Sequence, residues 1–166
     1  MFIRTKRLFL RPAWREDAPA LSQLLADPGY QRDLTGSPWL ETLADPDGLL
    51  SPQRGSGQVR LLIFRRTEGT PQLIGAAGLG RLFNHTEFGL WLNRAERRHG
   101  FAQEAGAALL SLAFNGLKLD SIWVPALQEG AAARLLARLG FRKAGKDGTL
   151  AALRANDYSN LSRLAA

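Results

Sequence analysis

Residues 87–112 read EFGLWLNRAERRHGFAQEAGAALLSL, and this stretch decides the fold. The alternating run from Glu87 to Leu92 is typical of a β-strand, and good helix formers predominate after Phe101. Between them, Gly100 and Ala102 lack bulk where a backbone has to approach an anion closely. The stretch therefore predicts a strand, a phosphate-binding turn and a helix whose unpaired N–H groups face that turn.

The turn carries three side chains that can be positively charged, Arg97, Arg98 and His99. Their charge adds to the oriented amides and the dipole of the following helix, and the combination suits a pyrophosphate. The pattern Arg-x-x-Gly-x-Ala is short, so an exposed basic helix cap is the alternative explanation when the segment is taken alone. The surrounding sequence favours the phosphate site.

The spacing of Arg97, Gly100 and Ala102 resembles the acyl-CoA-binding motif of the GNAT acyltransferase superfamily, which is Gln or Arg, two residues, Gly, one residue, then Gly or Ala. The resemblance extends to TKRLFLRP at residues 5–12 and LLARLGF at residues 135–141. The chain is most similar to the branch with ribosomal-protein N-terminal (alanine or serine) acetyltransferases. This implies acetyl-CoA as the acyl donor, no metal, and a mixed α/β domain with a central, mostly antiparallel, splayed sheet flanked by helices.

Composition narrows the class of protein. At 166 residues the chain has the size of one domain, which we expect to span residues 1–166. No apolar run approaches the roughly 20 residues of a membrane helix, and the start has no signal-peptide pattern, so a cytoplasmic protein is expected. With no cysteine and only two histidines, thiolate chemistry is excluded and a metal centre is not expected.

The net charge of +7 is compatible with nucleic acid, a ribosomal surface, an acidic peptide or the phosphates of CoA. Basic residues are spread along the chain without a run of five or more. A solvated basic surface is therefore favoured over a nucleic-acid site. A homodimer is a possible assembly that no sequence feature requires.

Hydrophobic patterns and breakers predict the remaining elements. Asp17 is expected to cap the first helix, the connection at residues 83–86 is expected to be a loop, and residues 30–57 are expected to form a lid over the acceptor, with Arg32, Trp39 and Leu40 as contact candidates. Strands are predicted in one segment up to Leu10 and at residues 59–66, 72–81, 87–92 and 121–124, and helices up to Leu25 and at 40–50, 101–115 and 131–139.

In the resembled family, two neighbouring strands splay after the third strand of the meander, and the pantetheine arm enters the gap. The resemblance implies that the main chain of Leu90, Trp91 and Leu92 contacts the acyl-pantetheine. For the Trp91 side chain, packing in the core is as well supported as contact with the ligand. The pyrophosphate is then held by Arg97, Arg98, His99, Gly100, Phe101 and Ala102.

Acetyl transfer to an amine needs a neutral nitrogen, a donor for the oxyanion and a proton for the departing thiolate. An α-amine, with a pKa of about 8, needs less help than a lysine amine at about 10.4. We therefore expect a protein N-terminal α-amine or a small-molecule amine as acceptor, attacking directly in a ternary complex. The absence of cysteine agrees with a reaction that has no covalent enzyme intermediate.

Glu87 is the preferred general base, because it begins the strand that faces the proposed cleft. An edge-strand carboxylate paired with arginine is the alternative. His85, expected in a loop, is a second candidate base. Tyr158 is a candidate acid for the thiolate if the tail folds back as the last strand, and a turn at residues 157–160 is the alternative.

Two positions depart from the family pattern. Counting back from Gly140, Asn is common eleven residues earlier and Ser eight residues earlier, whereas this chain has Glu129 and Ala132. Glu129 can still accept a hydrogen bond from the cofactor arm, and Arg134 and Arg138 can reach phosphates. Ala132 cannot donate a proton. A catalytically weakened CoA-binding or partner-binding module is therefore the alternative function.

Overall fold

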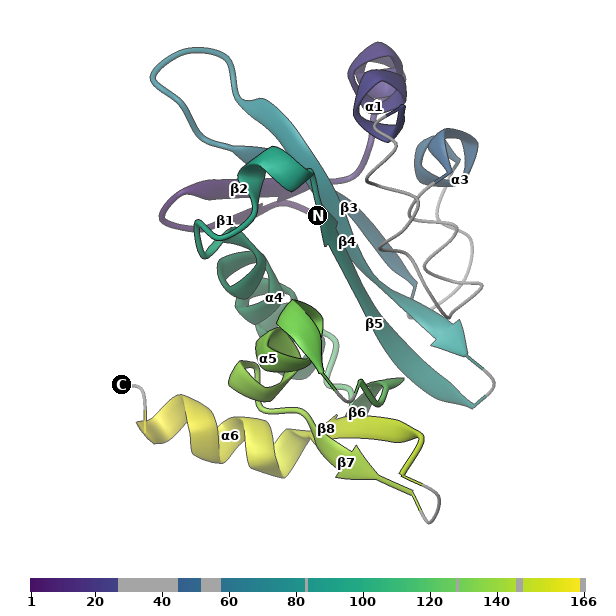
Figure 1. Ribbon diagram of the computed structural model, residues 1–166, viewed down its shortest axis with the longest axis vertical. Helices are drawn as coiled ribbons and strands as arrows, with labels where there is room; N and C mark the ends of the chain where they lie inside the picture. The colour runs from purple at the N-terminus through teal and green to yellow at the C-terminus, as the bar shows by residue number, and fades with distance from the viewer. Residues whose placement is uncertain (27–44, 52–57, 83, 128, 146–147, 165–166) are drawn as a thin grey trace.

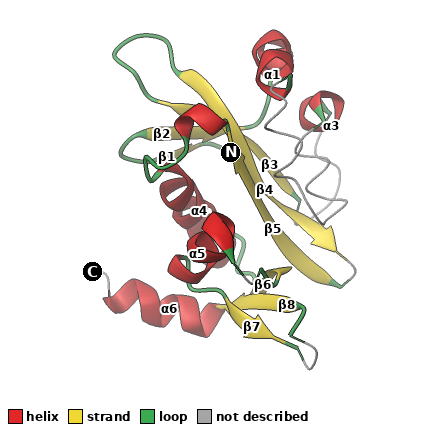
Figure 2. Cartoon of the chain, viewed as in Figure 1, coloured by secondary structure: helices red, strands yellow, loops and turns green. Residues whose placement is uncertain are grey.

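The computed structural model describes residues 1–26, 45–51, 58–82, 84–127, 129–145 and 148–164. In these residues an eight-stranded open sheet has the order β1-β2-β3-β4-β5-β6-β8-β7. Neighbouring strands are antiparallel except for the parallel pair β5 and β6. Figure 1 shows α1 and α3 on one face of the sheet and α4 and α5 on the other, and Figure 2 shows the same layers by element type. The predicted mixed α/β fold with a mostly antiparallel sheet is confirmed.

The amino terminus forms a hairpin of β1 (Ile3–Arg4) and β2 (Leu8–Arg11), so the prediction of one strand is wrong. The side chain of Thr5 causes the reversal, because its Oγ1 accepts a hydrogen bond from the Leu8 N–H at 2.9 Å. A single 3-10 turn (Arg15–Asp17) leads into α1 (Ala18–Leu25).

Asp17 does not cap α1 with its side chain, contrary to prediction. Its carboxylate accepts the Trp14 N–H at 2.7 Å and pairs with both terminal nitrogens of Arg11 at 2.7 and 2.8 Å. Asp17 therefore closes the turn before the helix and ties it to β2. Both side chains of this ion pair are about nine-tenths buried, at 11% and 10% exposed.

Helix α3 (Pro46–Leu50) is capped by Asp45, whose side chain accepts hydrogen bonds from the N–H groups of Asp47 and Gly48. It is shorter than the predicted helix at 40–50, of which residues 40–44 lie outside the described residues. The acceptor-contact candidates Arg32, Trp39 and Leu40 also lie outside them.

Three antiparallel strands form the predicted meander: β3 (Val59–Arg65), β4 (Gln72–Leu82) and β5 (His85–Leu92). The fourth and fifth strands extend further than expected, because His85 pairs with Leu82 and Thr86 with Arg81. The prediction of a loop at these two residues is wrong. His85 therefore lies on the same strand as Glu87.

The second half of the chain contains elements that the sequence patterns did not predict, namely β7, β8 and α6. Strand β8 lies between β6 and β7, so the last strand ends before Tyr158. Tyr158 lies in α6, and both the strand and the turn expected there are wrong. The elements are α4 (Phe101–Ser111) with a π-helical turn (Leu112–Gly116), β6 (Ser121–Pro125), α5 (Gly130–Arg138), β7 (Arg142–Ala144), β8 (Leu150–Arg154) and α6 (Ala155–Leu164).

Each face of the sheet has its own core. The larger core joins the sheet to α4 and to the end of α5, and Leu109, Ile122 and Leu153 are fully buried in it. The smaller core packs Leu21 of α1 and Leu49 of α3 against the opposite face. None of the described helices is long and apolar enough to cross a membrane.

Candidate active site

The sheet opens between β5 and β6. These strands share a single register pair in the described residues, Glu87 with Trp123. After Glu87, β5 continues to Leu92 along β4, whereas β6 pairs along its length with β8. The two parallel strands therefore separate toward their carboxyl ends, as the prediction of a splayed sheet required.

The alternation of the backbone decides which groups of β5 face this opening. The Asn93 N–H donates to the Ile74 carbonyl in β4 at 2.7 Å, so the main chain of Trp91, two residues earlier, also faces β4. The main-chain groups of Leu90 and Leu92 then face the opening. Arg97 donates from Nε and Nη2 to the Leu92 carbonyl at 3.3 Å. This geometry favours Leu90 and the Leu92 N–H as partners for an acyl-pantetheine.

The Trp91 side chain packs in the smaller core and is 5% exposed. This arrangement matches the packed-aromatic alternative for its side chain. A Cβ built on Gly75 would lie 2.2 Å from the Trp91 carbonyl oxygen, which agrees with a Trp91 main chain directed at β4. The Trp91 side chain therefore packs on the face of the sheet that carries α1 and α3, and the Trp91 main chain does not face the opening.

The predicted phosphate turn begins after a 3-10 helix (Arg94–Glu96) and ends where α4 begins at Phe101. Arg98 and Gly100 both adopt left-handed backbone conformations, with φ of 66° and 79°. For Gly100 this costs little, but for Arg98 it costs about 1–2 kcal/mol, so surrounding contacts have to hold the turn. The Glu104 N–H makes the first helical hydrogen bond, to the Gly100 carbonyl at 3.1 Å.

The first N–H groups of α4 have no carbonyl one turn before them within the helix, so they are available to an anion beside the turn. The side chains of Arg98 and His99 are exposed there, and the His99 ring stacks on Phe101 at 5.8 Å between centroids. Ala102 is half-buried in the first turn. Arg97 instead reaches back to β5, so it stiffens the entrance to the turn.

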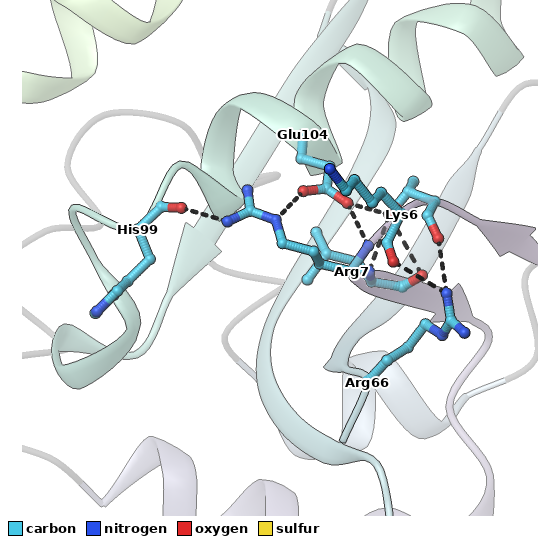
Figure 3. A network of polar contacts seen from close by, with 7 residues as sticks. Lys6, Arg7, Arg66, His99 and Glu104 are labelled. Carbon is cyan, nitrogen blue, oxygen red and sulfur yellow. Dashed lines mark hydrogen bonds and ion pairs between the residues drawn. The ribbon is translucent and has the colours of Figure 1, made fainter. Parts of the chain in front are cut away.

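A polar network that sequence reasoning missed joins this turn to the amino-terminal hairpin (Figure 3). Arg7 donates from Nε to Glu104 Oε2 at 2.7 Å and from Nη1 to the His99 carbonyl at 2.8 Å. Glu104 Oε1 accepts the Arg7 N–H at 2.8 Å and the Thr5 hydroxyl at 2.5 Å. The motif TKRL contained the signal, because it holds both Thr5 and Arg7.

Two opposing effects act on the Glu104 carboxyl. Burial raises its pKa, but hydrogen bonds from Thr5 and Arg7 outweigh the burial, so the pKa lies below its ordinary value. The side chains of Arg7 and Glu104 are 44% and 17% exposed. The carboxylate charge that the network neutralises lies in the first turn of α4.

The predicted base Glu87 lies on β5, an interior strand, and is 1% exposed. The position at a sheet edge, expected in the alternative explanation of Glu87, is therefore wrong. Because side chains alternate along a strand, Glu87 shares with Trp91 the face that carries α1 and α3. His85 lies on this face too, and its ring contacts that of Trp123 at 4.4 Å between centroids.

Trp123 is a second residue that sequence reasoning missed as a site candidate. It is half-buried, its Nε1–H donates to the Ser121 hydroxyl at 3.0 Å, and it pairs with Glu87 across the opening strands. Its neighbours Ile122 and Val124 point into the larger core, so Trp123 faces the side of Glu87 and His85. Only the sheet topology brings these three side chains together.

Three other predicted site residues lie apart from the turn. Glu129 and Arg134 line a cavity of about 600 Å³ between the end of β6, α5, β7 and β8, and its described lining includes no residue of β5 or of the turn. Tyr158 is half-buried and stacks on Phe114 at 4.8 Å. Within the described ranges, no group of three or more His, Asp or Glu side chains could hold a metal ion.

Comparison with known proteins identifies the arrangement. The family model of the acetyltransferase (GNAT) domain matches residues 7–142. No curated protein matches the sequence. The matched range includes residues 7–12 of the amino-terminal motif, the meander, the opening between β5 and β6, and the turn before α4.

Solved structures agree in fold. An acetyltransferase from Agrobacterium tumefaciens is 26% identical with a TM-score of 0.67, over 92% of each chain. RimJ of Mycobacterium smegmatis in complex with CoA-disulfide is 20% identical with a TM-score of 0.66, over 99% of this chain and 93% of that chain. A ribosomal-protein-S5-alanine acetyltransferase from Vibrio fischeri is 15% identical with a TM-score of 0.69, over 95% of this chain and 98% of that chain.

Proposed function

The chain belongs to the GNAT acetyltransferase family, whose members use acetyl-CoA, and we propose that it transfers the acetyl group to a primary amine by direct attack in a ternary complex. The observation that carries the proposal is the opening between β5 and β6, which starts at the Glu87–Trp123 pair and lies next to the turn before α4. It offers a narrow main-chain edge beside a buried carboxylate. A cytoplasmic location remains a prediction.

The residues present fit acetyl-CoA. The left-handed Gly100 keeps the turn open at the start of α4, where Phe101 and Ala102 contribute helix N–H groups, and Arg98 and His99 add charge. Leu90 and the Leu92 N–H would bind the amide-containing arm along the open edge of β5. Glu129 and Arg134 remain predicted cofactor contacts. They line the cavity beside α5, whose described lining includes no residue of β5 or of the turn before α4, so this prediction has less support.

When bound, acetyl-CoA supplies an activated thioester carbonyl. The carboxylate of Glu87 accepts the proton that the amine loses as its nitrogen bonds to the acetyl carbon and the carbon–sulfur bond breaks. His85 is the second candidate base on the same strand face. The departing sulfur also needs a proton, which Ala132 cannot donate; the tail strand that would have brought Tyr158 to the sulfur does not form, because Tyr158 lies in α6.

The acceptor enters on the face that carries α1 and α3, because Glu87 lies there. We propose a protein N-terminal α-amine or a small-molecule amine; of these, an α-amine loses a proton more readily than a lysine amine. The structural likeness to a ribosomal-protein-S5-alanine acetyltransferase supports the first option. The basic chain, with a net charge of +7, also suits an acidic acceptor.

Acetyl-CoA binding by calorimetry, followed by thiol release with α-amino peptides, amino acids and polyamines in the same samples, tests the proposal. We expect binding together with thiol release that depends on one acceptor class. The departures at Glu129 and Ala132 favour one alternative, a weakened CoA-binding module. Binding without any acceptor-dependent release would support that alternative, and absence of binding would contradict both.

A further inference from the structure

We propose that Arg7 is a positioning residue for the cofactor-binding turn, which it holds in shape by joining the His99 carbonyl to the Glu104 carboxylate. The inference rests on the proposed function, because it concerns the site for acetyl-CoA. Arg7 lies in the hairpin turn between β1 and β2, and it reaches residues 92 and 97 positions away in the sequence. Figure 3 shows its side chain between the turn and α4.

The orientation of one peptide group explains the effect. Arg7 Nη1 donates to the His99 carbonyl oxygen at 2.8 Å, and the peptide bond between His99 and Gly100 is trans. In a trans peptide the N–H points opposite to the carbonyl, so the Gly100 N–H points away from Arg7. Among the described residues, no backbone acceptor is recorded for this N–H. Arg7 thus orients the Gly100 N–H toward the side of the turn away from Arg7, where this group can donate a hydrogen bond to an anion.

Arg7 also packs against the end of the turn, at Gly100 and Phe101. A Cβ built on Gly100 would lie 3.3 Å from Arg7 Nη2, and the guanidinium carbon lies 4.6 Å from the centre of the Phe101 ring. The left-handed conformation of Arg98, two residues before Gly100, needs such support, because an arginine rarely adopts it unaided. Arg7 supplies this support from the amino-terminal hairpin, through its hydrogen bond to the carbonyl of His99, the residue after Arg98.

Charge gives Arg7 a second role. Glu104 lies in the first turn of α4, where its negative charge would repel the phosphates of a bound cofactor. The guanidinium of Arg7 and the hydroxyl of Thr5 bind both of its oxygens, so the carboxylate is neutralised and turned toward the hairpin. Removal of Arg7 would release the turn and expose the phosphate site to this charge.

The test compares Arg7→Ala with Arg66→Ala. Arg66 belongs to the same network, donating from Nη1 to the Thr5 and Lys6 carbonyls at 3.2 and 3.0 Å, but it has no recorded contact with His99, Gly100 or Glu104 in the described residues. Calorimetry with CoA should show about tenfold weaker binding for Arg7→Ala, and less than twofold for Arg66→Ala. Arg7→Lys should also bind weakly, because one ammonium cannot span both acceptors.

The amide resonance of Gly100 gives a readout that a general loss of stability would not move. In the wild type, saturating CoA should shift the Gly100 N–H signal downfield, and in Arg7→Ala and Arg7→Lys the shift at saturation should be smaller. An unchanged shift, an affinity within twofold of wild type, or equal losses in Arg66→Ala would overturn the role of Arg7. If the wild type itself binds no CoA, the proposed function fails instead.

Discussion

Glu87 of β5 and Trp123 of β6 form the single register pair between these strands in the described residues, and both side chains lie on the face of the sheet that carries α1 and α3. The pair marks the point where the sheet opens. In the proposed reaction, the buried Glu87 carboxylate would be the proton acceptor for an incoming amine, and the rings of Trp123 and His85 would form an aromatic wall beside it. The chemical and structural features of the proposed site therefore meet at this pair.

Glu87→Gln tests the base. The substitution keeps the size of the buried side chain but removes its capacity to accept a proton, so kcat should fall by about 100-fold while the Kd for CoA stays unchanged. Glu68→Gln, in the exposed hairpin turn, is the control and should behave as wild type. Wild-type turnover in Glu87→Gln, combined with a large loss in His85→Gln, would move the base to His85.

The Arg11–Asp17 pair predicts a pH dependence of stability. Burial raises the pKa of Asp17, but hydrogen bonds from Arg11 and the Trp14 N–H outweigh it and lower the pKa below its ordinary value. A lowered pKa stabilises the folded state above the unfolded pKa of about 3.9, and the contribution is lost as the pH falls through the folded pKa.

Asp17→Asn should therefore reduce the free energy of unfolding by about 3 kcal/mol near neutral pH, because Arg11 loses its buried partner. The difference from wild type should shrink when the pH falls below about 4. Urea unfolding at pH 7 and pH 3 measures this, with the exposed neighbour Glu16→Gln as the control. The same difference at both pH values would contradict the stabilising role of the Asp17 charge.

The sequence predicted the elements whose pattern is locally strong. The meander strands alternate clearly, and the turn before α4 depends on Gly100 and its neighbours in the chain. Strand β8 was missed because its sequence LAALR favours a helix, yet pairing with β6 and β7 on both sides makes it a strand. Tertiary context overrode local propensity there.

The candidate site likewise contains some residues that are neighbours in the sequence and others that only the fold brings together. The turn before α4, where we propose that the phosphates bind, is contiguous in sequence, so its position could be predicted, whereas Arg7 and Glu104 are 97 positions apart and meet only in the folded chain. The partnership of Glu87 with Trp123 likewise requires knowledge that β6 lies beside β5. Sequence reasoning found the groups that a turn brings together and missed those that a topology brings together.

Gly106→Val tests the contact between α4 and the end of α5. A Cβ on Gly106 would lie 2.7 Å from Leu139 Cδ1 and 3.5 Å from Phe88 Cζ, so any side chain at this position forces the buried Leu139 side chain to move. We expect a loss of about 1–3 kcal/mol in the free energy of unfolding, measured with urea. Ala107→Val, at an exposed position of the same helix, should cost much less.

Gly100→Ala separates backbone conformation from side-chain chemistry at the phosphate turn. At a φ of 79° an added Cβ is strained, and it would also lie 3.3 Å from Arg7 Nη2, so the turn should relax away from the shape that directs its amides inward. The affinity for CoA should fall by about tenfold, a loss of roughly 1.4 kcal/mol. Gly69→Ala is the matched control, because a Cβ at Gly69 meets nothing within 4 Å. Calorimetry that finds equal affinities for the two variants would mean that the pyrophosphate does not bind at this turn, since of the two glycines only Gly100 has a left-handed backbone conformation.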